Sequence, residues 1–394
     1  PLRTSPFYER EQELGAYFVE GGGWERPHWY GVNETLLGRY DVPGRNAWAA
    51  RYWHPIVGAE ARATRDGVAL YDVTPLKRIA VEGPGAAAFL DRLTTNRVDR
   101  PVGTVVYSLL LDDRGGVRSD LTIARLAQDR FQVGANGPLD LDELERRAAA
   151  DGRGEVSVRD VTSGTCCIGL WGPRAREVLA SVTDADVSNE AFPYFRAREL
   201  WIGNVPVTAL RLSYVGELGW ELYTSADMGL RLWDTLWAAG REHGVIAAGR
   251  GAFGSLRLEK GYRSAGVDMT TEHDPYEAGL GFAVRMDKGE FVGRSALEGK
   301  SAATVERRLV PLLIDDRDAV VMGKEPVHVD GRPIGYVTSA GFGYTIGSAI
   351  AYAWLPAAAA RSGQRVAIRY FGEDVPARVS DEPLFDPEMR RLRS

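Results

Sequence analysis

In Tyr214-Val-Gly-Glu217-Leu-Gly-Trp220-Glu221-Leu-Tyr223, two carboxylates and three aromatic rings lie within ten residues. Tyr214 and Glu221 flank a Gly-x-x-Gly pair, which is typical of a tight turn. A carboxylate beside flat rings suits a planar heterocycle whose edge carries N–H donors, because charge-assisted hydrogen bonds are strong and directional. A further carboxylate, Asp120, follows the glycine turn formed by residues 114–116. These two segments carry the functional interpretation.

The composition is that of a globular protein. The 394 residues suggest two to three domains, and 44% are hydrophobic and 26% charged. The net charge of −6 argues against non-specific nucleic-acid binding, which needs a basic face. No apolar run approaches the ~20 residues that a membrane helix requires. The chain lacks a secretory apolar segment, so we expect a cytoplasmic protein that binds neither nucleic acid nor membrane.

We expect neither a metal site nor a dinucleotide site. Its two cysteines, Cys166 and Cys167, are adjacent in an apolar segment, and we expect them to be inert core thiols. No two of the five histidines share a metal-ligand spacing, so no metal site is expected. There is no Walker loop, and we expect no dinucleotide site.

The pattern of strands and helices predicts an α+β protein in three parts. Residues 1–45 are aromatic and turn-rich, and we expect an arm that packs on the body. The order strand, Gly-Pro, helix, strands, helix occurs twice, which predicts two pseudo-repeated α+β domains over 46–160 and 161–300. Short strands punctuated by glycine follow in 305–394 and predict a small β-barrel or sandwich.

Four motifs occur in a characteristic order. They are Gly115-Gly116-x-x-x-Asp120-Leu121, the Tyr214–Glu221 segment, Leu256-Arg257-Leu-Glu259-x-Gly261 and Pro275-x-Glu277-x-x-Leu280. Together they resemble the tetrahydrofolate-dependent aminomethyltransferase family, the T-protein of the glycine cleavage system. Residues 102–107 and 287–294 resemble still more the folate-binding half of dimethylglycine and sarcosine dehydrogenases, in which an FAD domain precedes this region. The resemblance covers residues 46–385.

The resemblance implies a fold and a cofactor. Two α+β domains, of which 46–160 is the first folate-binding one, and a C-terminal β-barrel surround a central hole that holds tetrahydrofolate. The chain also departs from the family, because Ser119 stands where the T-protein commonly has a second aspartate before Asp120-Leu121. This departure makes glycine cleavage the weaker substrate assignment.

The resemblance assigns the pterin ring to the first segment. Glu221 would accept N–H bonds from the pterin edge, with Tyr214 packed beside it. The alternative is that Glu221 is a strand carboxylate that faces solvent. Glu217 is a further candidate for cofactor binding, although a turn role suits it better.

The catalytic candidates are Asp120 and Tyr107. By resemblance, Asp120 lies near folate N5 and N10, where an anion would stabilise a cationic, iminium-like carbon. Alternatively, Asp120 caps the hairpin after the two glycines. Tyr107 matches a pocket tyrosine of the family, but an isolated aromatic residue in a strand is usually a core residue.

Three more residues are candidates for cofactor binding. Asn136 follows a predicted strand at a family folate contact, although a turn asparagine is equally consistent. Arg257 either pairs with a folate carboxylate or buttresses Glu259 within its helix. Tyr262 is a further pocket candidate.

The expected function is tetrahydrofolate-dependent one-carbon transfer. The donor would be a small N-methyl amine or its iminium, an S-methyl or O-methyl compound, or an aminomethyl group on a carrier. The iminium route implies a separate flavoprotein oxidase as a partner. The alternatives are a folate-dependent methyltransferase running in the synthetic direction and a non-catalytic folate-binding module.

Overall fold

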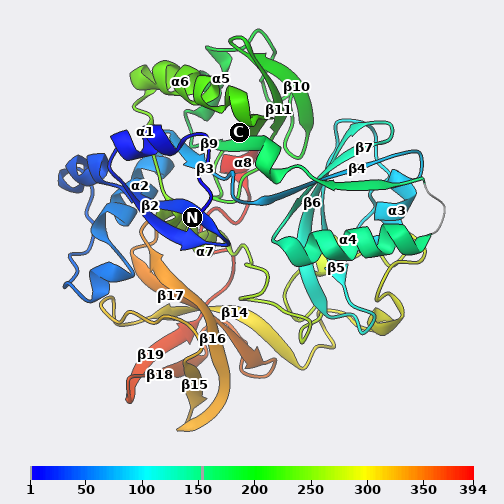
Figure 1. Ribbon diagram of the computed structural model, residues 1–394. Helices are drawn as coiled ribbons and strands as arrows, with labels where there is room; N and C mark the ends of the chain where they lie inside the picture. Colours follow the sequence, from blue (N-terminus) through cyan, green and yellow to red (C-terminus); the bar gives the residue numbers. More distant parts are fainter. Residues whose placement is uncertain (1, 152–154) are drawn as a thin grey trace.

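The computed structural model describes residues 2–151 and 155–394. Figure 1 shows two mixed α/β units, each built on one sheet, above a β-barrel formed by about the last quarter of the chain. The predicted α+β fold with a C-terminal barrel is confirmed. No helix in the described ranges is both long and apolar enough to cross a bilayer.

The N-terminal residues form a helix and a hairpin that pack on the body. Helix α1 (Tyr8–Glu13) precedes strands β1 (Ala16–Gly21) and β2 (Trp24–Tyr30), which pair antiparallel. Phe7 and Tyr30 at the ends of this unit have no exposed surface and belong to the core of the six-stranded sheet. Burying these two aromatic side chains fixes the hairpin against the rest of the molecule.

The first large sheet has six strands in the order β10-β11-β12-β9-β3-β13. The strands are β3 (Ala69–Asp72), β9 (Thr165–Trp171), β10 (Ala197–Ile202), β11 (Val205–Leu210), β12 (Gly219–Ser225) and β13 (Ile246–Ala247). Helices α5 (Ala175–Ala180) and α6 (Gly229–Gly240) contribute to the core that covers it. Strand β3 falls within the range 46–160 but pairs with β9 and β13, so the chain enters this sheet before it builds the other one.

The second large sheet has five antiparallel strands in the order β5-β6-β7-β4-β8. They are β4 (Lys77–Glu82), β5 (Val105–Leu111), β6 (Val117–Ala127), β7 (Arg130–Ala135) and β8 (Ser157–Asp160), with helices α3 (Ala86–Leu93) and α4 (Pro138–Asp151). Gly115 has φ of +80° at the β5–β6 turn, a conformation that glycine adopts without strain. The predicted hairpin after this turn is confirmed.

Two helices lie between the sheets and the barrel. The sequence predicts a helix over residues 51–66, but α2 begins at Pro55 and ends at Asp66. Proline favours the first helical position and keeps the residue before it extended, which explains the later start. Helix α7 (Arg250–Lys260) ends at Gly261, whose φ is +75°.

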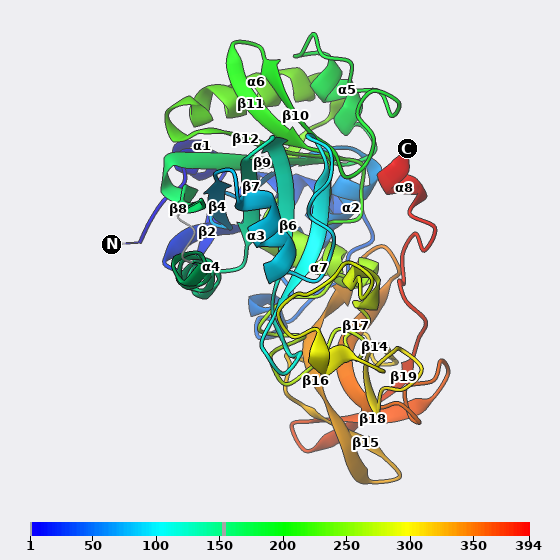
Figure 2. The same cartoon turned by 90° about the vertical axis from the view of Figure 1, so that its right-hand side faces the viewer.

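The C-terminal barrel is closed and consists of six strands. They are β14 (Arg307–Ile314), β15 (Pro326–Val329), β16 (Arg332–Gly343), β17 (Ser348–Pro356), β18 (Arg365–Tyr370) and β19 (Glu373–Val379). After the barrel the chain returns to the body, where α8 (Arg390–Arg393) lies beside the six-stranded sheet, as Figure 2 shows.

Candidate active site

Asp120 lies in β6, opposite Leu109 of β5, and receives hydrogen bonds on both carboxylate oxygens. The Tyr107 hydroxyl donates to Oδ2 at 2.9 Å, and Asn136 Nδ2 donates to Oδ1 at 2.8 Å. Tyr107 pairs with Thr122, two residues beyond Asp120, so the two side chains share one face of the hairpin. The structure therefore brings together three of the residues that the sequence singled out.

The loop that carries Asn136 is fixed by Asp140 in the first turn of α4. Asp140 Oδ2 accepts from the backbone N–H of Asn136 at 2.8 Å, from Gly137 at 3.2 Å and from the Ser119 hydroxyl at 3.0 Å. Ser119 Oγ in turn accepts from Asn136 Nδ2 at 2.9 Å. Sequence reasoning missed Asp140, although an acidic residue just inside a predicted helix is the usual sign of such a contact.

Burial raises the pKa of Asp120, and the hydrogen bonds from Asn136 and Tyr107 oppose that shift. Among the described residues, no lysine or arginine lies within ion-pair distance of this carboxylate. Burial and the neighbouring Asp120 also raise the pKa of Tyr107, so its hydroxyl stays protonated and remains a donor. A buried carboxyl group with neutral donors and no cation is a frequent feature of functional sites.

An aromatic wall stands beside this carboxylate. Tyr214 stacks on Phe253 with ring centroids 4.9 Å apart and contacts Tyr262 at 5.6 Å. The Tyr214 hydroxyl donates to the backbone oxygen of Arg263. Burial raises the pKa of Tyr214, the charge of Arg257 opposes the shift, and the charges of Asp120 and Asp268 add to it. Phe253, which the sequence reasoning missed, lies one helical turn before Arg257.

Tyr107 itself belongs to a second stacked aromatic pair. Phe282 stacks on Tyr107 at 5.8 Å and is 63% exposed. Both rings line a cavity of about 560 Å³. Four arginines also line it: Arg97, Arg100, Arg196 and Arg285. The approach to the Tyr107–Asp120 pair is therefore wide and positively charged. Phe282 was also missed, although it lies just beyond the Glu277-x-x-Leu280 motif.

Glu221 lies in β12, between Gly169 of β9 and Leu210 of β11. The Tyr223 hydroxyl donates to Glu221 Oε2 from two residues further along the same face of the strand. Burial raises the pKa of Glu221 to about 7, while Tyr223 and the charge of Arg78 oppose the shift. The carboxyl group is thus substantially desolvated, which disfavours the alternative of a carboxylate that simply faces water.

Arg78 lies close to this pair and is only 1% exposed. Its guanidinium donates to the backbone oxygens of Thr74, Leu76, Thr162 and Thr165 and to Thr165 Oγ1, at 2.8–3.2 Å. In the described parts of the chain no carboxylate pairs with it. Its guanidinium carbon lies 5.8 Å from the Tyr223 ring centroid, so its positive charge acts on the Glu221–Tyr223 pair.

Arg257 supports the aromatic wall from behind. Its Nη1 donates to Asp268 Oδ2 at 2.7 Å and to the backbone oxygen of Tyr262 at 3.0 Å, and its Nη2 donates to Ser339 Oγ at 2.7 Å. Of the two alternatives for Arg257, these contacts disfavour the one in which it buttresses Glu259. Residues two apart on a helix point to different sides, and Glu259 pairs instead with Arg65 at 3.0 Å.

Glu217 lies apart from the Asp120 group. It has no exposed surface and forms ion pairs with Arg65 at 2.9 Å and with Arg391 at 2.8 Å. Its oxygens are committed to arginines that join α2 and α8 to the turn before β12. The contacts described here favour the turn role for Glu217, whereas Asp120, Tyr107, Asn136, Tyr214 and Tyr262 form one neighbourhood with Arg257 behind them.

Comparison with known proteins identifies the family. The GCVT N-terminal domain matches residues 7–288, and the glycine cleavage T-protein C-terminal barrel domain matches residues 307–386. The chain is 33% identical to an aminomethyltransferase of Moorella thermoacetica, with 98% of each protein covered. The crystal structure of the glycine cleavage system aminomethyltransferase T from Bartonella henselae superposes with a TM-score of 0.83 at 29% identity, covering 98% of this chain and 99% of that one.

Other relatives are longer proteins. The chain is 39% identical to 4-methylaminobutanoate oxidase (formaldehyde-forming) of Paenarthrobacter nicotinovorans, over all of this chain and 47% of that protein. It is 32% identical to mitochondrial dimethylglycine dehydrogenase of Homo sapiens, over 99% of this chain and 45% of the relative. The chain thus spans about half the length of these two proteins and nearly all of the aminomethyltransferases. Its domains and relatives together show that the chain belongs to the glycine cleavage T-protein family.

Proposed function

We propose that this chain transfers a one-carbon unit from a small methylated or aminomethyl donor to tetrahydrofolate. The observation that carries the proposal is the desolvated Asp120 carboxylate, held by Tyr107 and Asn136 beside an aromatic wall. Relatives named aminomethyltransferase, dimethylglycine dehydrogenase and formaldehyde-forming oxidase all act on one-carbon groups attached to amines, which supports the donor class.

The residues present suit a reduced pterin. Such a ring is flat and its edge bears adjacent N–H donors, so it requires aromatic surfaces and a carboxylate acceptor. Tyr214, Phe253 and Tyr262 supply the surfaces. Glu221 would accept the N–H donors, since its desolvated oxygens gain most from a charge-assisted hydrogen bond. When bound, tetrahydrofolate supplies the nucleophilic nitrogens that take up the carbon.

Asp120 would act on the charge that develops during transfer. A one-carbon unit leaving an amine has cationic, iminium-like character, and a fixed anion nearby lowers the barrier. The raised pKa of the carboxyl group also suits it to hold a proton released in the reaction. Tyr107 and Asn136 would keep the carboxylate in one orientation, and Asp140 would hold Asn136.

The donor's oxidation would take place outside residues 1–394. An N-methyl amine becomes an iminium only after two electrons are removed, and the GCVT N-terminal domain and the T-protein C-terminal barrel domain already account for residues 7–288 and 307–386. We therefore propose that a flavin-dependent oxidation supplies the iminium, carried out by a separate flavoprotein or by another part of a longer chain. The length of the oxidase and dehydrogenase relatives supports this division of labour.

The test compares two aspartate variants on the same hairpin. Asp120→Asn removes the buried charge, whereas Asp113→Asn makes the same substitution at an exposed position in the turn. Each protein is supplied with tetrahydrofolate and with an iminium generated continuously by a dimethylglycine-oxidising flavoprotein, and 5,10-methylenetetrahydrofolate is quantified. We expect Asp120→Asn to lower the enzymatic rate above the spontaneous background by roughly 100- to 1000-fold, and Asp113→Asn to leave it unchanged.

Two results would reject the proposal. If wild type does not exceed the spontaneous rate, the chain is not a transferase for this donor class. If Asp120→Asn keeps the wild-type rate and binds tetrahydrofolate normally, the chemistry does not depend on this carboxylate.

A further inference from the structure

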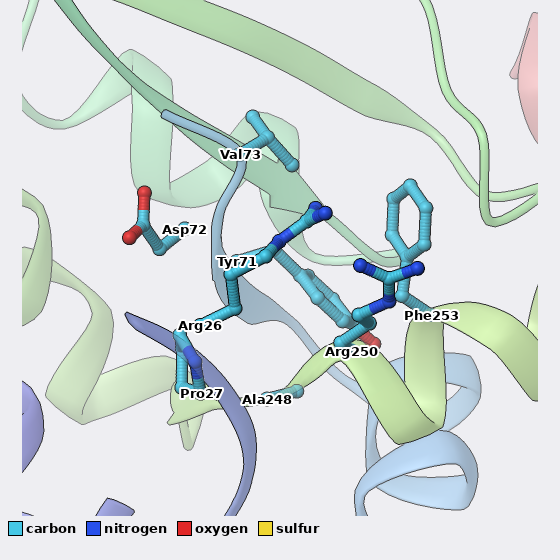
Figure 3. Close-up of a pocket in the computed structure, with 8 residues that line it drawn as sticks. All are labelled: Arg26, Pro27, Tyr71, Asp72, Val73, Ala248, Arg250 and Phe253. Atoms are coloured by element: carbon cyan, nitrogen blue, oxygen red, sulfur yellow. The ribbon is translucent and has the colours of Figure 1, made fainter. Parts of the chain in front are cut away.

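Two arginines converge on one point between the N-terminal hairpin and the body, as Figure 3 shows. Arg26 lies in β2, and Arg250 is the first residue of α7. A Cβ atom placed on Gly21 would lie 2.8 Å from Arg26 Cδ and 3.1 Å from Arg250 Nη1. The absence of a side chain at Gly21 therefore gives both guanidinium groups the space that they occupy.

Neither guanidinium has a hydrogen-bond or ion-pair partner in residues 2–151 and 155–394. Asp72 lines the same pocket, but its carboxylate points away from the two groups in Figure 3. Asp72 Oδ1 accepts from the backbone N–H of Thr74 at 2.9 Å instead. The charge of Asp72 thus acts on Arg26, but no carboxylate in residues 2–151 and 155–394 forms an ion pair with either guanidinium.

This arrangement is unfavourable in the free protein. Burial lowers the pKa of Arg26 to about 10, the charge of Arg250 contributes to the lowering, and the charge of Asp72 opposes it. The start of α7 carries the positive end of the helix dipole, so an arginine as its first residue is repelled there. Partly buried charges normally occur with a partner of opposite sign. Two arginines without an ion-pair partner are therefore a candidate site for an anion.

The pocket adjoins the aromatic wall. Phe253 lines it and also stacks on Tyr214 at 4.9 Å. The pocket is small, about 20 Å³ on the measure that gives about 560 Å³ for the cavity beside Tyr107, so it has room for a small charged group only. Its remaining lining is mostly apolar or aromatic: Pro27, Tyr71, Val73 and Ala248. It is suited to the charged end of a ligand whose other part lies against Tyr214.

We propose that Arg26 and Arg250 form a subsite for a carboxylate of the ligand bound in the active site. Two guanidinium groups can hold a carboxylate through paired, charge-assisted hydrogen bonds. The inference rests on the proposed function, in which two ligands bear carboxylates: the glutamate end of tetrahydrofolate and an N-methyl amino acid donor. The chemistry is shared, and the experiment separates the two sources.

Calorimetry with four probes makes that separation. The first pair is 5-formyltetrahydrofolate, which carries the glutamate, and 6-methyltetrahydropterin, which has the pterin edge alone. The second pair is dimethylglycine, which carries a carboxylate, and trimethylamine, which does not. The proteins are wild type, Arg26→Gln, Arg250→Gln and the control Arg361→Gln, which removes an exposed charge on the barrel. Thermal unfolding without ligand checks that each variant is folded.

If the subsite holds the glutamate, each of the two variants loses roughly 10- to 100-fold in affinity for 5-formyltetrahydrofolate and none for 6-methyltetrahydropterin. If it holds the donor, the same loss occurs for dimethylglycine and not for the folate. In both cases the ligand-free unfolding temperature stays equal or rises, because a repulsion has been removed. A purely structural pair of arginines would instead lower it.

Unchanged affinities for both carboxylate probes in Arg26→Gln and Arg250→Gln would overturn the inference, and binding of 6-methyltetrahydropterin would then leave the proposed function standing. If wild type binds no pterin compound, the proposed function fails. The subsite is then tested with dimethylglycine alone. Weaker dimethylglycine binding by Arg26→Gln and Arg250→Gln than by wild type supports the subsite, and equal binding or no binding to wild type overturns it.

Discussion

Replacing Glu221 with glutamine should make the protein more stable and its folate binding weaker. The substitution keeps the size of the side chain and an oxygen that can accept from Tyr223, but it removes the charge. Burial raises the pKa of Glu221 from 4.5 to about 7, a difference of about 2.5 units. At about 1.4 kcal/mol per unit, the charged form costs the fold about 3 kcal/mol.

The sign of the pH dependence follows from linkage. Below about pH 4.5 the carboxyl group is protonated in both states and contributes no penalty. Between pH 4.5 and 7 the unfolded chain releases this proton and the folded chain keeps it, so the free energy of unfolding falls as the pH rises. Above pH 7 the full penalty remains. Glu221→Gln should therefore exceed wild type in stability by up to about 3 kcal/mol at pH 8 and differ little at pH 4.5.

Folate affinity should change in the opposite direction. Only the ionised carboxylate accepts two N–H bonds, and about a tenth of Glu221 is ionised at pH 6, so wild type should bind 5-formyltetrahydrofolate roughly tenfold more weakly at pH 6 than at pH 8. Glu221→Gln should bind it roughly 10- to 100-fold more weakly than wild type at pH 8, with no such pH dependence.

The assays are urea unfolding followed by tryptophan fluorescence, and calorimetry, each at several pH values. The control is Glu199→Gln, the same substitution at an exposed position on β10 of the same sheet. Wild-type affinity of Glu221→Gln at pH 8 would refute the pterin-acceptor role. An unfolding free energy with the same pH slope in both proteins would refute the reasoning from burial.

Three further perturbations test the rest of the site. Tyr107→Phe removes a hydrogen-bond donor to Asp120, so we expect roughly tenfold slower transfer. The acid limb of the pH–rate profile should move to higher pH, because the pKa of the Asp120 carboxyl group rises further. An unmoved acid limb would mean that Asp120 does not titrate in the reaction. Asp140→Ala removes the carboxylate that accepts from the Asn136 backbone N–H, and we expect the free energy of unfolding to fall by about 1–3 kcal/mol and transfer to be slower. An unchanged transfer rate would show that the Asn136 loop does not depend on Asp140. Glu217→Gln breaks a buried ion-pair network, so the free energy of unfolding should fall by about 3–5 kcal/mol while the folded protein keeps its folate affinity. A loss of folate affinity without a loss of stability would show that Glu217 binds the cofactor.

The sequence by itself determined the local elements and the family. The glycines before Asp120 predict the β5–β6 hairpin because the turn needs a positive φ, and Gly261 ends α7 for the same reason. The order of the four motifs was sufficient to indicate the T-protein family, and the change from helix-containing segments to short strands marked the barrel. These properties depend on residues that are close together along the chain, so the sequence pattern alone indicates them.

Only the tertiary structure decided which side chains meet. Asn136 reaches Asp120 because Asp140 folds its loop back across the sheet, and Glu217 is drawn away from the site by Arg391, far along the chain. The raised pKa of Glu221 also depends on burial between strands that are distant in sequence. Burial and long-range pairing arise when separate segments pack together, and a residue's type and spacing do not encode which distant partner it will find.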